Sequence, residues 1–269
     1  MQKTIALKNI RMYKLLMQRM KVKKIFILGT VLLISGCATL YNPATGRNEF
    51  IMIDSETEVA IGKSVGTQML KKQPLSDDRS LHERVNAIGR RISGVSDRQD
   101  IEYKFYVLQD KELNALTLPG GFIYANKGLM KILSDDELAY VLAHEVGHTA
   151  ARHIAKKLQA HMAYQLILSV AFASSGSDAG GGAENVARGV DTVYNLVSLS
   201  YSRKDEYEAD RLGVKYAFKA GFDPYAAISA LERIRKEEGP NWKLLSYFRT
   251  HPYVDERIAA LKKIIPELK

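Results

Sequence analysis

The chain has 269 residues, of which 46% are hydrophobic and 26% are charged, and this profile excludes a disordered or fibrous protein and is typical of a globular one. The formal net charge of +9 first points to a nucleic acid or a membrane surface as partner. Eight of the 39 basic side chains lie in residues 1–36, which contain no acidic side chain, so 31 basic and 30 acidic side chains remain. The body is nearly neutral, and no nucleic-acid partner is predicted.

Residues 1–36 predict a lipoprotein signal peptide. The basic head is followed by IFILGTVLLIS at 25–35, an apolar run with the length of a signal-peptide core and short for a membrane span. Small residues directly before Cys37 resemble the lipobox of bacterial lipoproteins, in which the cysteine carries the lipid. The alternative is a short N-terminal membrane anchor with an incidental cysteine.

Both interpretations place the body across the membrane. Cys37 is the only cysteine, so no disulfide can form within the chain. Ala38 stands where enterobacterial lipoproteins of the inner membrane typically carry aspartate, which favours the periplasmic face of the outer membrane. We therefore expect a bacterial periplasmic protein attached to the membrane through a lipid on Cys37, with an extended tether at 37–54 and one domain at 55–269.

The domain is predicted to be α+β and mainly helical, with one small sheet. Ser55, three residues before Glu58, has capping-box spacing and predicts a helix to about Lys72. Strands are predicted at 101–110 and in NALTLPGGFIYANKG, where Pro119-Gly120-Gly121 marks a turn. Further helices are predicted around 81–92, 204–220, 224–237 and 253–264.

A second capping box, Ser134 with Glu137, predicts the helix that carries AYVLAHEVGHTAARH at 139–153. After it, the apolar run at 159–173 predicts a buried helix; a membrane span is the alternative, although the run is short for one. The small-residue segment at 174–189 predicts a mobile connection.

The stretch HEVGH predicts a catalytic metal site. Residues four apart share one face of a helix, so His144 and His148 can bind one Zn²⁺ through their imidazoles. Glu145 lies one position round and can take a proton from water that the metal acidifies. The alternative is that the two histidines cap or pack against a buried helix.

The third ligand is expected from another part of the chain. If the helix continues, His153 lies on its far face and is interpreted as a solvated residue, and His161 is also off the metal face. Glu206 and Asp210 are four apart on a later helix, where Gly213 and Ala217 leave room for close packing. Glu206 can bind the metal while Asp210 accepts a hydrogen bond from a ligand imidazole. Glu208 is assigned to solvent.

The combined motifs resemble the HtpX and CAAX-prenyl-protease type of zinc metallopeptidase, from about Asn42 to Ile264. HEVGH is followed by SRKDEYEADRLG, preceded by NALTLPGGFIYANKGLM, and succeeded by a His-Pro pair. The most similar members are short periplasmic lipoproteins of the BepA and LoiP type. The resemblance implies a gluzincin fold, one Zn²⁺ bound by His144, His148 and Glu206, and Glu145 as general base.

Two further roles are implied by the resemblance. His251 of the His-Pro pair is expected to reach the zinc site, either to stabilise the oxyanion or to close the metal in a resting state; the alternative is a turn residue held by Pro252. Arg257 matches an arginine that supports the site in this family, and a surface arginine is the alternative.

The strand in NALTLPGGFIYA matches the family's strand beside the active site. As an edge strand it would pair with an extended substrate, beginning at Asn114 or Ala115; the alternative is an ordinary core strand. We therefore expect a zinc endopeptidase that degrades misfolded or misassembled envelope proteins as unfolded polypeptides, in contact with the outer-membrane assembly machinery. A chaperone with a self-closed zinc site is the second hypothesis. A prenyl-type peptidase acting within the membrane fits poorly, because the body shows no convincing span.

Overall fold

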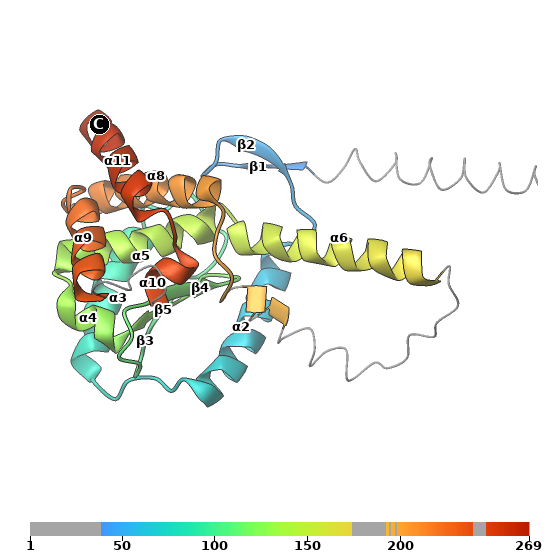
Figure 1. Cartoon of the computed structure of the whole chain (residues 1–269), viewed down its shortest axis with the longest axis horizontal. Coiled ribbons are helices and arrows are strands. Elements are labelled where there is room, and N and C mark those ends of the chain that lie inside the picture. Colours follow the sequence, from blue (N-terminus) through green and yellow to red (C-terminus); the bar gives the residue numbers. More distant parts are fainter. Residues whose placement is uncertain (1–38, 174–191, 194, 197, 239–245, 269) are drawn as a thin grey trace, which may run out of the picture. The chain divides into compact units, whose positions relative to one another are not determined.

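A computed structural model describes residues 39–173, 192–193, 195–196, 198–238 and 246–268 (Figure 1). The predicted signal peptide at 1–36, Cys37 and the segment at 174–189 lie outside the described residues. The chain divides into two compact units. The described part of the smaller unit is Thr39–Tyr41 with Asn48–Met52, and the larger unit comprises Asn42–Arg47 and the chain from Ile53 onward.

The described chain contains two small β-sheets, where the sequence predicted one. In the larger sheet β5 is central, with β3 parallel on one side and β4 antiparallel on the other, so β4 forms an edge. The second sheet pairs β1 with β2 inside the segment that was expected to be an extended tether. The strands are β1 (Thr39–Asn42), β2 (Arg47–Phe50), β3 (Lys104–Leu108), β4 (Ala115–Leu118) and β5 (Phe122–Asn126).

Helices form most of the described chain, which confirms the mainly helical α+β class. The sequence does not predict α4 or α10, since helices of six and five residues offer too few positions for a periodic pattern. The helices are α2 (Ser55–Lys72), α3 (Arg79–Ser93), α4 (Lys127–Ile132), α5 (Asp135–Ala150), α6 (His153–Ala173), α8 (Arg203–Lys219), α9 (Ala226–Glu238), α10 (Ser246–Thr250) and α11 (Val254–Ile264), followed by a 3₁₀ turn at Ile265–Glu267.

Helix α5 is the core of the larger unit. Every residue from Glu137 to Ala150 is buried, so beyond its first two residues this helix has no solvent face. It lies between α8 and the three-stranded sheet, with α3 and α9 packed against it as well (Figure 1). A helix that is enclosed on all sides offers a water-free position for polar side chains, and HEVGH is located there.

The predicted capping box at the start of α5 is confirmed. Ser134 Oγ accepts a hydrogen bond from the backbone N–H of Glu137 at 3.3 Å, and the Glu137 carboxylate accepts one from the backbone N–H of Ser134 at 2.9 Å. Both bonds satisfy N–H groups that the first turn of a helix leaves without intrahelical partners.

Replacing Ser134 by Ala is expected to lower the free energy of unfolding by about 1 kcal/mol, because the first turn loses its side-chain acceptor. Urea denaturation followed by circular dichroism measures this change. The exposed position accepts Asn, which caps as well as Ser, so Ser134→Asn should unfold like the parent chain. Equal stability of the Ala and Asn variants would show that the cap contributes nothing.

The capping box predicted at the start of α2 is wrong in its residues. Asp54, one residue earlier, caps the helix by accepting from the backbone N–H of Thr57 at 2.7 Å. Glu58 instead is buried and forms ion pairs with Arg98 at 3.0 Å and Arg152 at 2.6 Å. Partners distant in sequence therefore take the carboxylate that local spacing assigned to the helix terminus.

The buried helix predicted at 159–173 is wrong for the part of α6 whose side chains are described. Ile154, Ala155 and Leu158 are buried, but Met162 and Tyr164 are 56% and 57% exposed. Hydropathy alone does not bury a helix; a packing partner is required, and Figure 1 shows α6 extending away from the helices around α5. None of the helices in the described part of the chain has the length and apolar character needed to cross a membrane.

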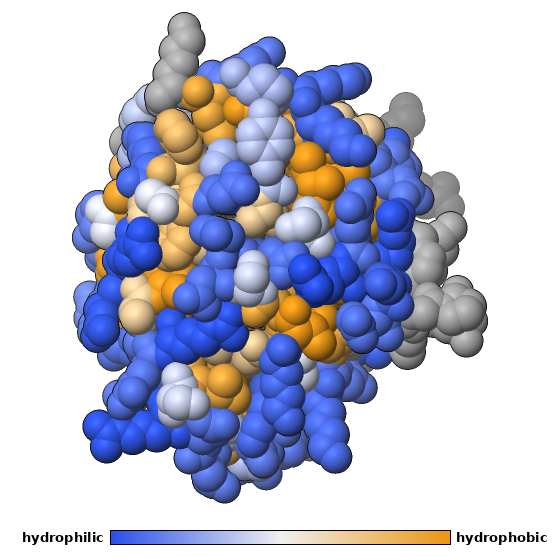
Figure 2. All heavy atoms as spheres, turned by 90° about the vertical axis from the view of Figure 1, so that its left-hand side faces the viewer, coloured by the Kyte–Doolittle hydropathy of each residue, from blue (hydrophilic) through white to orange (hydrophobic). Residues whose placement is uncertain are grey.

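The surface carries both hydrophilic and hydrophobic side chains. Figure 2 shows the face that lies on the left-hand side of Figure 1, where α9 and α4 are located. Hydrophilic side chains separate several hydrophobic patches on that face. Apolar atoms commonly form more than half of the surface of a folded protein, so exposed apolar side chains do not by themselves mark a binding site.

Candidate metal centre

Helix α5 places His144, Glu145 and His148 in the interior. All three are 0% exposed. The spacing of four residues puts both histidines on one face, as the sequence predicted, and their Nε2 atoms lie 3.0 Å apart. Two imidazole nitrogens this close together can coordinate the same metal ion.

Helix α8 brings Glu206 to the same point because α5 and α8 pack closely. A side chain at Gly147 would meet the carbonyl oxygen of Ala209 at 2.9 Å, and one at Gly213 would meet the backbone nitrogen of His144 at 3.1 Å. Both glycines therefore permit a backbone approach that a larger residue would prevent. The sequence indicated Gly213 for this purpose but missed Gly147.

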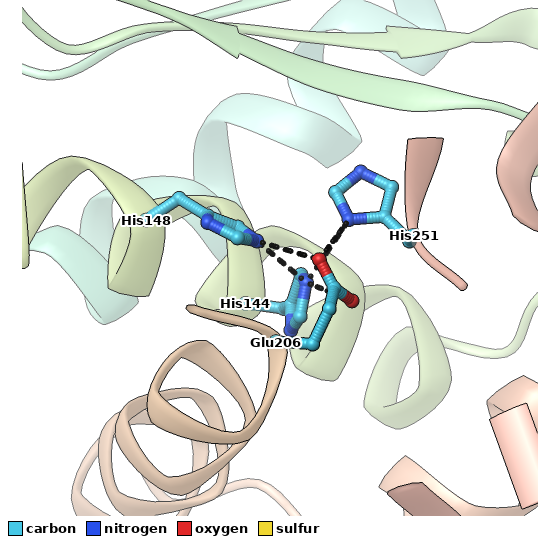
Figure 3. A group of neighbouring side chains, drawn as sticks. All are labelled: His144, His148, Glu206 and His251. Atoms are coloured by element: carbon cyan, nitrogen blue, oxygen red, sulfur yellow. Dashed lines mark hydrogen bonds and ion pairs between the residues drawn. The ribbon is translucent and has the colours of Figure 1, made fainter. Parts of the chain in front are cut away.

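His251 completes a group of four. It follows α10, whose last turn it closes by donating its backbone N–H to the carbonyl of Tyr247. Its Nδ1 lies 3.2 Å from Glu206 Oε1 and 3.3 Å from His144 Nε2. Figure 3 shows the side chains of His144, His148, Glu206 and His251 directed toward one another, and one ligand atom from each lies within 4.8 Å of the others.

The donor atoms fit a zinc ion. Bonds of about 2.1 Å in a tetrahedron separate neighbouring ligand atoms by about 3.4 Å. Glu206 Oε1 lies 3.4 Å from His148 Nε2, and Glu206 Oε2 lies 3.6 Å from His144 Nε2, so both oxygens are close to that spacing from an imidazole nitrogen. Glu206 Oε2 is also buried without an aligned hydrogen bond, although Arg257 is within ion-pair distance. Imidazole nitrogens with one carboxylate oxygen are a typical zinc ligand set.

The protonation states of the ligands also suit a cation. Burial lowers the pKa of His148 well below its usual value, so the imidazole is neutral. Burial alone would raise the pKa of Glu206, but the charges of Arg257 and His251 hold it well below the usual value. Metal binding requires neutral imidazoles and an ionised carboxylate, and His148 and Glu206 favour these states.

Asp210 and Arg257 surround the ligands. Asp210 Oδ1 lies 2.9 Å from Nδ1 of His144, which leaves Nε2 of that histidine free to face the metal position. Burial would raise the pKa of Asp210, yet Arg257 and the hydrogen bond from His144 lower it to about 2. The Tyr140 hydroxyl, which the sequence did not indicate, also donates to Asp210 at 2.7 Å.

Arg257 is fully buried, which excludes the alternative of a surface arginine. Its guanidinium lies 2.6 Å from Glu206 Oε2 and donates to Asp210 at 2.7 and 2.8 Å. It also donates to the carbonyl oxygen of His251 at 3.3 Å. The guanidinium group of Arg257 thus contacts two carboxylates of α8 and the backbone of His251.

Glu145 is placed for proton transfer. Neither carboxylate oxygen has an aligned hydrogen bond among the described residues, and Oε1 lies 3.3 Å from Nε2 of His251. Burial raises the pKa of Glu145 despite the neighbouring histidines, and a raised pKa makes the carboxylate a better base near neutral pH.

The interpretation of His153 and Glu208 as solvated residues is wrong. His153 is 3% exposed, and its Nδ1 lies 2.8 Å from Nδ1 of His148. Glu208 accepts from His153 at 3.2 Å and from Arg47 at 3.0 Å. Burial would raise the pKa of Glu208, but its hydrogen bond with His153 and the charge of Arg47 lower it to about 2.

The error has a local cause. The predicted exposure of His153 depends on a helix that continues through this residue, but α5 ends at Ala150 and Arg152 adopts the left-handed φ of 57° before α6 begins. No glycine or proline signals this break. His161, which was also excluded from the metal face, is outside the group of four.

A cavity opens beside Glu145. Tyr201, which the sequence did not indicate, lies on the wall of the cavity and stacks on the ring of His148 with centroids 3.8 Å apart. Asn114 also lines the cavity, and its buried Oδ1 has no hydrogen-bond partner among the described residues. The other lining residues are Gln73, Asp110, Glu112, Leu116, Asn126, Ser198, Arg249, Thr250 and His251.

Asn114 and Ala115, the two residues predicted to pair with substrate, have backbones that face opposite sides of β4. The backbone carbonyl of Asn114 already accepts from the N–H of Asn126 at 2.8 Å, so its backbone faces β5. In an antiparallel pair the next residue faces the other way, so the backbone of Ala115 faces the outer edge of β4. Ala115 is 1% exposed and does not line the cavity.

Comparison with known proteins places this chain among metallopeptidases. The sequence profile of peptidase family M48 matches residues 76–265. The mitochondrial metalloendopeptidase OMA1 of Schizosaccharomyces pombe is 33% identical over 84% of this chain and 66% of its own length. The β-barrel assembly-enhancing protease of Escherichia coli is 26% identical over 81% of this chain and 45% of its own length. The metalloprotease LoiP of E. coli is 31% identical over 64% of both chains.

The chain thus spans less than half of the β-barrel assembly-enhancing protease and about two thirds of the other two relatives. The profile match nevertheless covers most of the described larger unit, including α5, α8 and the residue that follows α10. It contains His144, His148, Glu206 and His251, the group that could hold a metal ion. The chain therefore belongs to peptidase family M48, whose members are zinc-dependent metallopeptidases.

Proposed function

We propose that this chain is a zinc endopeptidase of the bacterial periplasm that hydrolyses peptide bonds in misfolded or misassembled envelope proteins. The observation that carries the proposal is the buried group of His144, His148 and Glu206, together with Glu145, which follows His144 on the same helix and lines the cavity. One zinc ion per chain is expected, because the group supplies one convergent set of donor atoms.

Each residue has a role in this reaction. Zinc contributes Lewis acidity toward the scissile carbonyl and toward water. Glu145 takes the proton of the attacking water and returns it to the leaving amine, which its raised pKa favours. His251 faces Glu145 through Nε2, where a donor can stabilise the negative oxygen of the tetrahedral intermediate. Asp210 and Arg257 keep His144 and Glu206 in their binding orientations.

The substrate class follows from the sheet. Backbone groups of Ala115 face the outer edge of β4, and an extended polypeptide can add there as another strand, independently of its sequence. Such pairing selects unfolded segments. Since Ala115 is buried, pairing requires a local opening at this edge, and Asn114 supplies an unpaired amide oxygen beside it.

The location rests on the sequence and on the relatives. A signal peptide at 1–36 with a lipid on Cys37 would attach the domain to the periplasmic face of the outer membrane, through the tether at 37–54. Two of the relatives are named as a β-barrel assembly-enhancing protease and the metalloprotease LoiP. By that similarity, the outer-membrane assembly machinery and its unfolded clients are the partners we propose.

A second candidate function is favoured by the position of His251. Its Nδ1 lies in the ligand group, and four protein ligands around zinc form a closed site without a position for substrate. In that state the protein would act as a chaperone or assembly factor with a latent metal site. The two candidates differ in whether the zinc-loaded chain cleaves protein.

Removing the metal tests the proposal. The full chain is expected to contain one zinc per chain by elemental analysis and to cleave unfolded casein, and a chelator should abolish cleavage because Glu145 has no Lewis acid to work with. Adding back one equivalent of zinc should restore it, whereas magnesium should not. Chelator-resistant cleavage would contradict the metallopeptidase, and bound zinc without any cleavage would favour the chaperone.

A further inference from the structure

The two ring nitrogens of His148 face different partners. Its Nε2 faces the ligand group, 3.0 Å from His144 and 3.4 Å from Glu206. Its Nδ1 faces the opposite way, toward Nδ1 of His153 at 2.8 Å. The two rings are nearly perpendicular, at 71°, with centroids 4.9 Å apart. A metal ligand therefore has another imidazole as its outer partner.

Only one arrangement of protons satisfies this contact in the metal-bound state. A histidine that binds a metal through Nε2 uses the lone pair there, so its proton sits on Nδ1. Nδ1 of His148 then donates to Nδ1 of His153, which must be unprotonated. The remaining proton of His153 lies on Nε2, where Glu208 accepts it at 3.2 Å.

Glu208, the outermost residue in this series of contacts, is held in place by an ion pair. Glu208 is held by Arg47 at 2.9 and 3.0 Å, and its side chain is 10% exposed. His153 and His148 are 3% and 0% exposed, so water does not compete for their contact. A hydrogen bond in such an environment is electrostatically stronger than one in water.

The backbone is bent to place His153 there. Arg152, in the left-handed conformation, pairs with Glu58 at 2.6 Å and donates to the carbonyl of Ile53 at 3.0 Å. These contacts hold the break between α5 and α6, which returns His153 to the face of His148. A straight helix would point His153 away.

We propose that His153 is a positioning residue of the metal centre, which accepts the Nδ1 proton of His148 and so presents Nε2 of His148 to a divalent metal ion. The inference rests on the proposed zinc site. Loss of such an outer partner typically weakens metal binding by about 10- to 100-fold.

Three substitutions separate this role from simple packing. His153→Phe keeps an aromatic ring without an acceptor, and its zinc Kd should be about 10- to 100-fold weaker in a competition assay with a chelator. His153→Asn places an amide oxygen near the position of Nδ1 and should retain most of the affinity. His153→Gln extends toward Glu208 instead and should resemble the Phe variant. His82→Phe removes a half-buried histidine that contacts Ser76, and should leave the affinity unchanged.

The outcomes are distinct. If the parent chain binds no zinc, the proposed function fails; if it binds zinc and His153→Phe binds as tightly, only this inference fails. Equal rescue by Asn and Gln would also overturn it, because packing would then explain the effect.

A measurement on the unsubstituted chain does not depend on the folding of any variant. With isotope-labelled histidine in the zinc-loaded full chain, proton–nitrogen correlations are expected to show His148 protonated at Nδ1 and His153 protonated at Nε2. A proton on Nδ1 of His153 would overturn the proposal.

Discussion

Replacing Glu145 by Gln is expected to lower kcat/KM for cleavage of an unfolded polypeptide by about 10²- to 10⁴-fold, with zinc still bound. Glutamine has nearly the same shape but cannot accept a proton from water. Glu145 does not belong to the group of ligand atoms, so the metal should stay in place. Both carboxylate oxygens lack an aligned hydrogen bond among the described residues, and Oε1 contacts His251, so the substitution breaks no aligned hydrogen bond in that part of the chain.

The measurement combines initial rates on casein with zinc content by elemental analysis. Glu83→Gln is the matched control, since Glu83 is an exposed carboxylate paired only with Arg79 among the contacts described and should cleave like the parent chain. Unchanged rates in the Glu145 variant would refute the assigned base. Loss of zinc in that variant would mean that Glu145 helps to hold the metal, contrary to its placement.

Replacing Arg257 by Met is expected to lower the free energy of unfolding of the zinc-free chain by about 3–5 kcal/mol. The guanidinium is fully buried between Glu206 and Asp210, whose pKa values it lowers. Without it, two carboxylates remain in the interior with their compensating charge removed. Zinc would compensate Glu206 in part, so the deficit should be smaller when the metal is bound.

Urea denaturation with and without zinc measures both effects. Arg235→Met is the control: Arg235 pairs with Asp255 at the surface, where an ion pair is worth about 0–1 kcal/mol. A loss below that of the control would show that Arg257 does not compensate the buried carboxylates. An equal loss of stability with and without zinc would show that the charge of Arg257 is not coupled to the metal site.

Local patterns predicted much of this protein. The capping box of Ser134 and Glu137 started α5 at the expected residue, and the spacing of His144 and His148 placed both on one helix face. The same spacing of four residues identified Glu206 and Asp210 on α8, and both side chains contact His144. Such features depend on neighbours within about one helical turn, so the sequence contains their causes.

Other features depended on partners distant in the chain. Glu58 fitted a local capping box, yet Arg98 and Arg152 hold it. His153 fitted an exposed position on a continuing helix, yet a break at Arg152 turned it to His148. The apolar part of α6 was expected to be buried, yet Met162 and Tyr164 are exposed.

By itself, the sequence determined most of the longer helices, the pair of histidines with the adjacent Glu145, and the chemistry that these residues can perform. Only the tertiary structure decided that Arg257 is buried, that His251 lies beside the other three donor side chains, and that His153 contacts His148. The physical reason is the distance along the sequence over which each interaction acts. Helix phase and capping are set by residues three or four positions apart, whereas burial and charge compensation are set by contacts between elements that the chain brings together only on folding.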